Sequence, residues 1–184
     1  MRIIGGEFRG RKLLSGRGDH TRPTADRTRE AVFNILGPDV QGAIVLDLFA
    51  GTGALGLEAL SRGAQSAFFI ETNKNTLPII KRNIHTCSAD SRATVVQWNI
   101  AKSLNCIRSV EPAFNLVFMD PPYNKHLLEP TLSNLHDSRC LDANVRVIIE
   151  HSAFETVPAG VVPFELHDQR RYGKTLVSFL GYML

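Results

Sequence analysis

The sequence predicts an α/β fold built on a doubly wound, mostly parallel sheet. Strand-like and helix-like segments alternate along the chain with short connections, which is typical of this class. The first strand-like segment, 43–49, is apolar throughout except at Asp47, as expected for a strand covered on both faces. The β-rich end of the chain has no helix between its strands, and it therefore predicts a hairpin at the sheet edge.

Local signals place the individual elements. A helix over 22–36 is expected, with Thr24 as its N-cap and Gly37-Pro38 at its end. The other strands are expected at 66–70, 93–98, 114–119 and 145–149, and the other helices at 73–85, 100–108 and 127–135. The hairpin strands are expected at 161–166 and 175–180, separated by the polar segment 168–174.

The whole-chain properties fit a single cytoplasmic domain. The 184 residues are 43% hydrophobic and 21% charged, with no apolar run of membrane-spanning length and no visible signal peptide. Cys87, Cys106 and Cys140 are scattered without a CxxC pair, and the six histidines are dispersed. Reduced thiols are therefore expected, and a metal site is not.

Positive charge gathers at the start of the chain. The net charge is +3, but residues 1–30 hold eight basic and four acidic residues, which leaves −1 for the remainder. Such an arm suits contacts with nucleic-acid phosphates, and the alternative is a solvated terminus. We expect residues 1–36 to form this arm and a helix, as one unit with 37–184. The candidate phosphate contacts are Arg9, Arg11, Lys12 and Arg22.

A glycine-rich loop follows the first strand and leads into a helix. Gly51 and Gly53 permit a tight turn and a close approach of the backbone to a ligand. The first amides of the helix favour a negative group, and ligands bind at this edge of parallel sheets. With Gly56, the spacing fits a dinucleotide fold equally well. The candidate cofactor contacts in the loop are Phe49, Ala50, Gly51, Thr52 and Gly53.

Three polar residues are predicted to surround that loop. Glu71 ends the second strand and can accept hydrogen bonds from ribose hydroxyls. An ionised Asp47 in an apolar strand needs a polar or cationic partner, either the amino group of S-adenosylmethionine or the loop amides. Asn99, followed by Ile100, comes after the third strand; it could contact an adenine edge or simply form a turn.

The tetrapeptide Asp120-Pro121-Pro122-Tyr123 ends the fourth strand at the same edge. An exocyclic base amine is a poor nucleophile because its lone pair is delocalised into the ring. Two acceptors, the Asp120 carboxylate and a carbonyl held by the prolines, would free that lone pair to attack a methyl group. Tyr123 offers a flat face for a displaced base. The alternative is a Pro-Pro turn beside an incidental acid and aromatic residue.

Longer segments resemble a known family. The opening MRIIGGEFRGRKL, the segment TRPTADRTREAVFNIL at 21–36 and the tail RYGKT at 171–175 are similar to the RsmD family of class I Rossmann-like methyltransferases. The resemblance implies a seven-stranded sheet with an antiparallel last strand, S-adenosylmethionine as cofactor, and the roles given above for the loop, Glu71 and 120–123. It further implies methylation of the N2 amine of one guanine in bacterial 16S rRNA. The family commonly has Asp where this chain has Asn99.

Two other functions stay open. One is an amino methyltransferase acting on DNA adenine N6 or a protein glutamine, although the chain has no room for a large specificity domain. The other is a catalytically silent RNA-binding or ribosome-assembly factor, which the intact Asp120 and Tyr123 argue against. We expect a monomer whose partner is 16S rRNA in the small ribosomal subunit, with no membrane and no metal.

Overall fold

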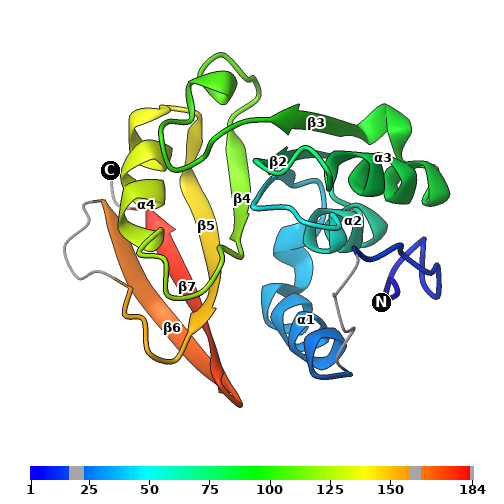
Figure 1. The fold of residues 1–184 in the computed structure, drawn as a ribbon, viewed down its shortest axis with the longest axis horizontal. Helices are drawn as coiled ribbons and strands as arrows, with labels where there is room; N and C mark the ends of the chain where they lie inside the picture. The colour runs from blue at the N-terminus through cyan, green and yellow to red at the C-terminus, as the bar shows by residue number, and fades with distance from the viewer. Residues whose placement is uncertain (17–22, 158–162, 183–184) are drawn as a thin grey trace.

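The computed structural model describes residues 1–16, 23–157 and 163–182, and a central sheet runs through it (Figure 1). Its strands are β1 (Ile44–Leu48), β2 (Ser66–Glu71), β3 (Ala93–Gln97), β4 (Phe114–Met119), β5 (Leu141–Ser152), β6 (Phe164–Tyr172) and β7 (Thr175–Tyr182). The α-helices are α1 (Pro23–Leu36), α2 (Ala54–Ser61), α3 (Leu77–Thr86) and α4 (Leu128–Asp137). Three short 3₁₀ turns connect them: η1 (Gly37–Val40), η2 (Asp90–Arg92) and η3 (Asn105–Ile107).

The strand order is β3-β2-β1-β4-β5-β7-β6. β1 to β5 pair in parallel, whereas β7 lies antiparallel between β5 and β6. This arrangement confirms the predicted α/β class, the seven strands and the antiparallel last strand. The order reverses at β1 and β4, and open parallel sheets bind their ligands where such a reversal occurs.

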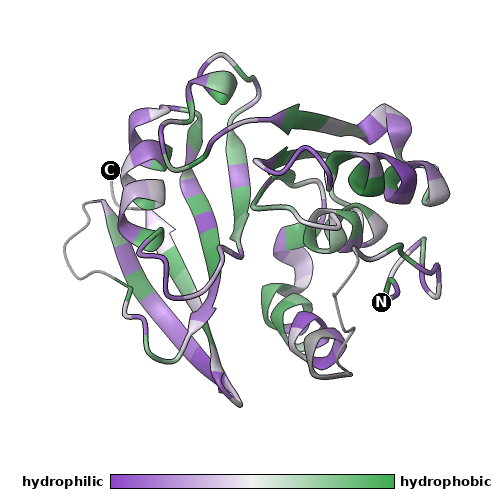
Figure 2. Cartoon of the chain, viewed as in Figure 1, coloured by the Kyte–Doolittle hydropathy of each residue, from purple (hydrophilic) through white to green (hydrophobic). Residues whose placement is uncertain are grey.

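The two faces of the sheet carry separate apolar clusters. Successive residues of β4 contribute alternately, so that Phe118 packs on one side and Val117 on the other. The first side is covered by α1, α2 and α3 through side chains such as Phe33, Leu57 and Ile80. The second side is covered by α4 through Leu128, Leu132 and Leu135. The hydrophobic colouring of the central strands in Figure 2 agrees with their burial between these layers.

One predicted helix is wrong. The segment 100–108 forms only the 3₁₀ turn η3, although Ile100, Leu104 and Ile107 are buried at helical spacing. The indole N–H of Trp98 donates to the carbonyl of Ser103 at 3.0 Å, so that carbonyl serves a tertiary contact instead of a helix. The apolar spacing therefore reported which side chains are buried, but not the backbone conformation.

Several predicted boundaries also shift. α3 begins at Leu77 instead of 73, because Asn73 forms a turn by accepting a hydrogen bond from the Asn75 amide at 3.0 Å. The polar segment 168–174 belongs to β6 as far as Tyr172, with the turn at Gly173. Polar residues occupy β6 because it is an edge strand exposed over most of its length. Residues 161–162 of the predicted hairpin and the Thr24 cap lie outside the residues and side chains described.

The N-terminal residues 1–16 fold onto the domain. Arg2 and Lys12 form an antiparallel bridge, which closes the arm into a loop. Ile3, Phe8 and Leu13 join the apolar cluster that α1, α2 and α3 cover. In the described part of the chain this arm is thus packed, in contrast to the solvated terminus considered as the alternative. No helix in the described ranges has the length and apolarity needed to cross a membrane.

Candidate active site

A cavity of about 850 Å³ opens at the carboxyl ends of β1, β2, β4 and β5. It brings together residues that lie far apart in the sequence. The predicted site residues on its wall are Asp47, Phe49, Ala50, Gly51, Thr52, Glu71, Asn99, Asp120, Pro121, Pro122 and Tyr123. Two predicted residues lie behind the wall: Gly53 at the start of α2 and Ile100 in the core below α4.

The glycine loop is held in a conformation that few residues adopt. Phe49, Gly51 and Gly53 have φ values of 59°, 54° and 78° in the left-handed region. The carboxylate of Glu71 braces the loop by accepting the Gly51 amide at 2.9 Å and the Asn73 amide at 2.8 Å. A carboxylate has about four acceptor positions, so Glu71 can accept further hydrogen bonds from a ligand in the cavity.

Asp47 is an acid with 2% exposure inside the sheet. The Gly56 amide donates to its Oδ2 at 2.9 Å, so a backbone partner is present, but it comes from the first turn of α2 instead of the glycine loop. Burial raises the pKa of Asp47 to about 7; the Gly56 hydrogen bond opposes this rise, and the charge of Glu71 adds to it. Gly56 is required there, because a Cβ would lie 2.4 Å from the Phe69 ring.

The tetrapeptide places its acid beside other acids. Asp120 is exposed toward the cavity, although many protein atoms lie around its carboxyl group. Burial raises its pKa well above the usual range, and the charges of Glu150 and Asp47 raise it further. The pKa of Glu150 is also raised, mainly by burial, while a hydrogen bond from Tyr123 and the charge of Arg29 oppose the rise. Asp120 and Glu150 are therefore both harder to ionise than ordinary carboxylic acids.

Tyr123 is fixed by its hydroxyl group. The hydroxyl donates to Glu150 Oε1 at 2.8 Å and lies 3.4 Å from Thr175 Oγ1 on β7. Burial, and then the charge of Glu150, raise the pKa of Tyr123, so the hydroxyl keeps its proton. The side chain is still 38% exposed, and a base can therefore reach the ring.

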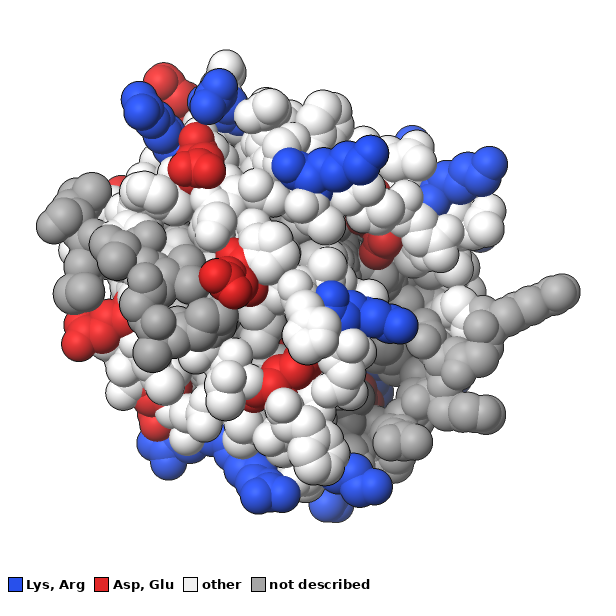
Figure 3. Space-filling model, turned by 60° about the vertical axis from the view of Figure 1, so that its left-hand side comes forward, with Lys and Arg blue, Asp and Glu red and all other residues white. Residues whose placement is uncertain are grey.

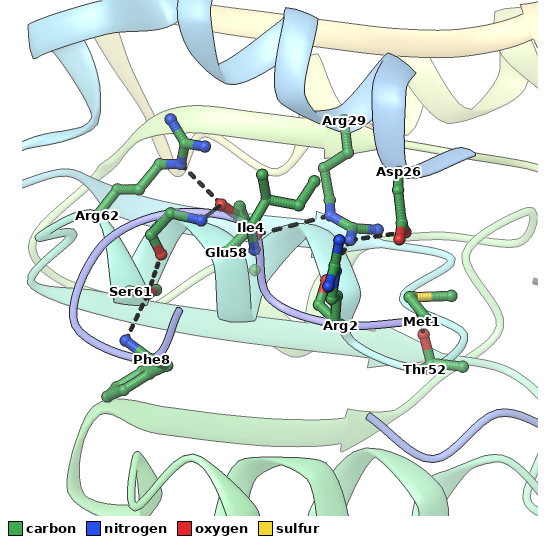
Figure 4. A network of polar contacts seen from close by, with 12 residues as sticks. Met1, Arg2, Ile4, Phe8, Asp26, Arg29, Thr52, Glu58, Ser61 and Arg62 are labelled. Atoms are coloured by element: carbon green, nitrogen blue, oxygen red, sulfur yellow. Dashed lines mark hydrogen bonds and ion pairs between the residues drawn. The ribbon is translucent and has the colours of Figure 1, made fainter. Parts of the chain in front are cut away.

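Sequence reasoning missed Arg29, Glu150 and Met1, which also line the cavity. Glu150 directly follows the predicted strand 145–149, so its position at the sheet edge was a usable signal. Arg29 has 6% exposure and donates to the Arg2 carbonyl at 2.6 Å and to Asp26 at 3.1 Å. It therefore joins the arm to the cavity wall (Figure 4).

Glu58 on α2 is the centre of the contacts in Figure 4. The side chain is fully buried, and its carboxylate accepts the amides of Ile4 and Gly5, each at 2.8 Å. It also pairs with Arg62 at 2.8 Å and lies 3.7 Å from the Nε of Arg29. One carboxylate thus ties the arm, α1 and α2 together.

The predicted phosphate contacts lie away from the cavity. Arg9 is exposed at a hollow between the arm and α1, and Lys12 is exposed on the arm. Arg11 is exposed but contacts the Thr86 carbonyl and stacks against Phe8, so it also serves the docking of the arm. Arg22 lies outside the described residues. The face of the molecule drawn in Figure 3 carries basic and acidic side chains mixed together, instead of a patch of one charge.

Comparison with known proteins gives matches over almost the whole chain. The family model described as "Conserved hypothetical protein 95" matches residues 1–181. "Ribosomal RNA small subunit methyltransferase D" of Escherichia coli (strain K12) is 38% identical over 174 residues, which cover 95% of this chain and 86% of that protein.

Solved structures share the fold. The Escherichia coli protein yhhF has a TM-score of 0.85 and 36% identity, and the match covers 100% of this chain and 98% of that one. A more distant structure, SMU.776 complexed with SAH, has a TM-score of 0.66 at 17% identity. That match covers 84% of this chain and 48% of that one, and at this identity it speaks for the fold alone.

Proposed function

The chain belongs to the RsmD family, described as Conserved hypothetical protein 95, and on this premise we propose that it methylates ribosomal RNA. Its methyl donor is S-adenosylmethionine, and its target is the exocyclic N2 of one guanine in 16S rRNA of the small ribosomal subunit. The observation that carries the proposal is that Asp120–Tyr123 opens into the same cavity as the glycine loop and Glu71. A donor and a base can therefore meet there.

The residues of the cavity fit the methyl donor. Glu71 lines the cavity and has free acceptor positions for ribose hydroxyls, and Asp47 is a buried acid whose pKa near 7 would be lowered by a neighbouring ammonium group. Asn99 lines the same wall and offers an acceptor and a donor to an adenine, without the charge that the family commonly has there. When bound, S-adenosylmethionine would supply an electrophilic methyl group in the cavity that Asp120 lines.

The tetrapeptide prepares the amine. The Asp120 carboxylate and a carbonyl of the Pro121-Pro122 segment accept its two hydrogens and draw the nitrogen toward a tetrahedral shape. The prolines keep that carbonyl aimed without further ordering. As the N–C bond forms and the S–C bond breaks, the nitrogen loses one proton. Asp120, with its raised pKa, is suited to receive that proton. The Tyr123 ring supports the base by stacking.

The arm supplies affinity for the RNA backbone. Residues 1–36 act with 37–184 as one unit, and Arg9, Arg11, Lys12 and Arg22 contact phosphates. The docking of the arm through Glu58 keeps Arg9, Arg11 and Lys12 at a fixed position relative to the cavity. The aromatic and acidic cavity then receives the base, while the arm holds the strand that carries it.

Replacing Asp120 by Ala tests the catalytic assignment. We expect Asp120→Ala to bind S-adenosylmethionine but to lose methyl transfer by a factor on the order of 10² or more. Calorimetry measures the binding, and incorporation of labelled methyl groups into small-subunit rRNA measures the transfer. Asp137→Ala, at the exposed end of α4, is the matched control. Full residual transfer by Asp120→Ala would refute the assignment.

Nucleoside mapping tests the target. The 16S rRNA of cells lacking the protein should have lost N2-methylguanosine at one site, and mass spectrometry detects that loss. Loss of a different methylated nucleoside instead would keep rRNA as the substrate but refute the guanine N2 assignment. An unchanged nucleoside profile would argue against an rRNA substrate.

A further inference from the structure

Asp120, directly after β4, and Glu150, inside β5, are neighbours across the two strands. In the parallel pair of β4 and β5, Met119 is opposite Ile149, and Asp120 and Glu150 are the residues that follow these two. Neighbouring strands are about 4.8 Å apart. Both carboxyls line the cavity, and the charge of Glu150 raises the pKa of Asp120. A base that enters the cavity therefore meets two carboxyls side by side.

Glu150 has acceptor capacity to spare. Its Oε1 receives the Tyr123 hydroxyl at 2.8 Å, and a carboxylate has about four acceptor positions. Arg29 lies near enough for its charge to favour the ionised form of Glu150. An ionised, partly satisfied carboxylate in a protein cavity attracts a further hydrogen-bond donor.

The bases differ in what they present to such a pair. Guanine has a ring N–H directly beside its exocyclic amine, so these two adjacent positions are both donors, with the O6 acceptor beyond them. Adenine has an unprotonated ring nitrogen beside its amine, and its lone pair would face a carboxylate. A glutamine amide has no ring N–H at all. Two adjacent acceptors, one for the amine and one for the ring N–H, therefore match guanine.

We propose that Glu150 is a specificity-determining residue that accepts the ring N–H of the target base while Asp120 accepts the amine. This inference rests on the proposed function and deepens it, because it assigns the choice of base to one side chain. Glu150 also anchors Tyr123, so a purely structural role is the competing explanation. The two differ in one respect: anchoring Tyr123 affects every base alike, whereas accepting the ring N–H affects only bases that have it.

The experiment compares guanine with 2,6-diaminopurine, which keeps the N2 amine but lacks the ring N–H. Small-subunit rRNA carrying either base at the target position is assayed free and in reconstituted subunits. We expect the wild-type protein to methylate guanine roughly 10- to 100-fold faster than 2,6-diaminopurine. In Glu150→Gln the amide oxygen can still accept the Tyr123 hydroxyl, while the amide NH₂ meets the ring nitrogen. That variant should therefore lose most of the preference.

The controls separate the explanations. Glu129→Gln removes the same charge at the exposed start of α4 and should keep the wild-type ratio of rates. Tyr123→Phe removes the anchoring hydrogen bond and should lower both rates without changing their ratio. A Glu150→Gln variant that slows both bases equally would overturn the proposal.

The wild-type protein alone also tests the proposal. Equal wild-type rates on guanine and 2,6-diaminopurine would overturn it even if no Glu150 variant folds. Failure of the wild-type protein to methylate guanine in either form of the substrate would instead refute the proposed function.

Discussion

Glu58→Gln is a substitution for which the structure predicts a large loss of stability at constant side-chain size. The buried carboxylate accepts the Ile4 and Gly5 amides on different oxygens and pairs with Arg62. A glutamine amide has only one oxygen. If that oxygen serves Gly5 and Arg62, the NH₂ group is directed at the Ile4 amide and at Arg29, which are themselves donors.

The size of the effect follows from those contacts. Removing one member of a buried ion pair costs about 3–5 kcal/mol, and a hydrogen bond to a charged group accounts for about 1.5–3 kcal/mol of it. Asp26 still compensates the charge of Arg29 at 3.1 Å, and the Arg62 side chain retains 20% exposure. We therefore expect the loss of stability to lie at the lower end of the 3–5 kcal/mol range, at about 3 kcal/mol. For a domain of this size, a loss of about 3 kcal/mol lowers Tm by about 6–12 °C.

Two measurements check this prediction. Thermal unfolding followed by circular dichroism gives Tm, and hydrogen exchange gives the protection of the Ile4 and Gly5 amides, which should fall together with it. Glu129→Gln is the control for loss of an exposed acid. A Tm decrease of about 2 °C or less, with the two amides still protected, would show that Glu58 does not hold the arm.

Two further predictions concern charge. The folded pKa of Asp47, about 7 against an ordinary 3.8, is raised, so its contribution to stability is present below pH 3.8 and is lost as the pH rises through about 7. Tm of the ligand-free protein should therefore fall across that window, and calorimetry should find tighter S-adenosylmethionine binding above pH 7; a flat affinity would argue against contact with the amino group. Replacing Arg9 and Lys12 by Ala should reduce the salt slope of RNA binding by about one for each phosphate that the variant no longer neutralises, and an unchanged slope would show that these two residues bind no phosphate.

The core of the fold could be predicted because the central strands have an apolar pattern that is visible in the sequence itself. Strands β1 and β4 are apolar along nearly their whole length, since both faces are covered, and this pattern is independent of distant partners. β6 has no such pattern, because an edge strand is defined by its pairing with β7 and not by burial. The segment 100–108 shows the opposite failure, because its helical apolar spacing marks burial without a helix.

The candidate site divides in the same way. Asp47, Glu71 and Asp120 end up on one wall because parallel strands deliver their carboxyl ends to one edge, and sequence order alone predicts that. The position of Glu150 at this edge could be predicted, but its place beside Asp120 depends on the register of β4 and β5, which the sequence does not show. Arg29 reaches the cavity through the packing of α1 and the arm, which no local pattern encodes.

The charges of the cavity explain why the proposed arm and the proposed catalytic motif need each other. Four carboxyl residues line its wall, and among the described lining residues Arg29 is the one Arg or Lys. Such a wall favours a cationic methyl donor and the donor edge of a neutral base, but it repels the phosphates on either side of that base. The target base must therefore leave its stack to enter the cavity while its backbone stays outside. Cations away from the cavity, such as Arg9 and Lys12, are then needed to hold the strand.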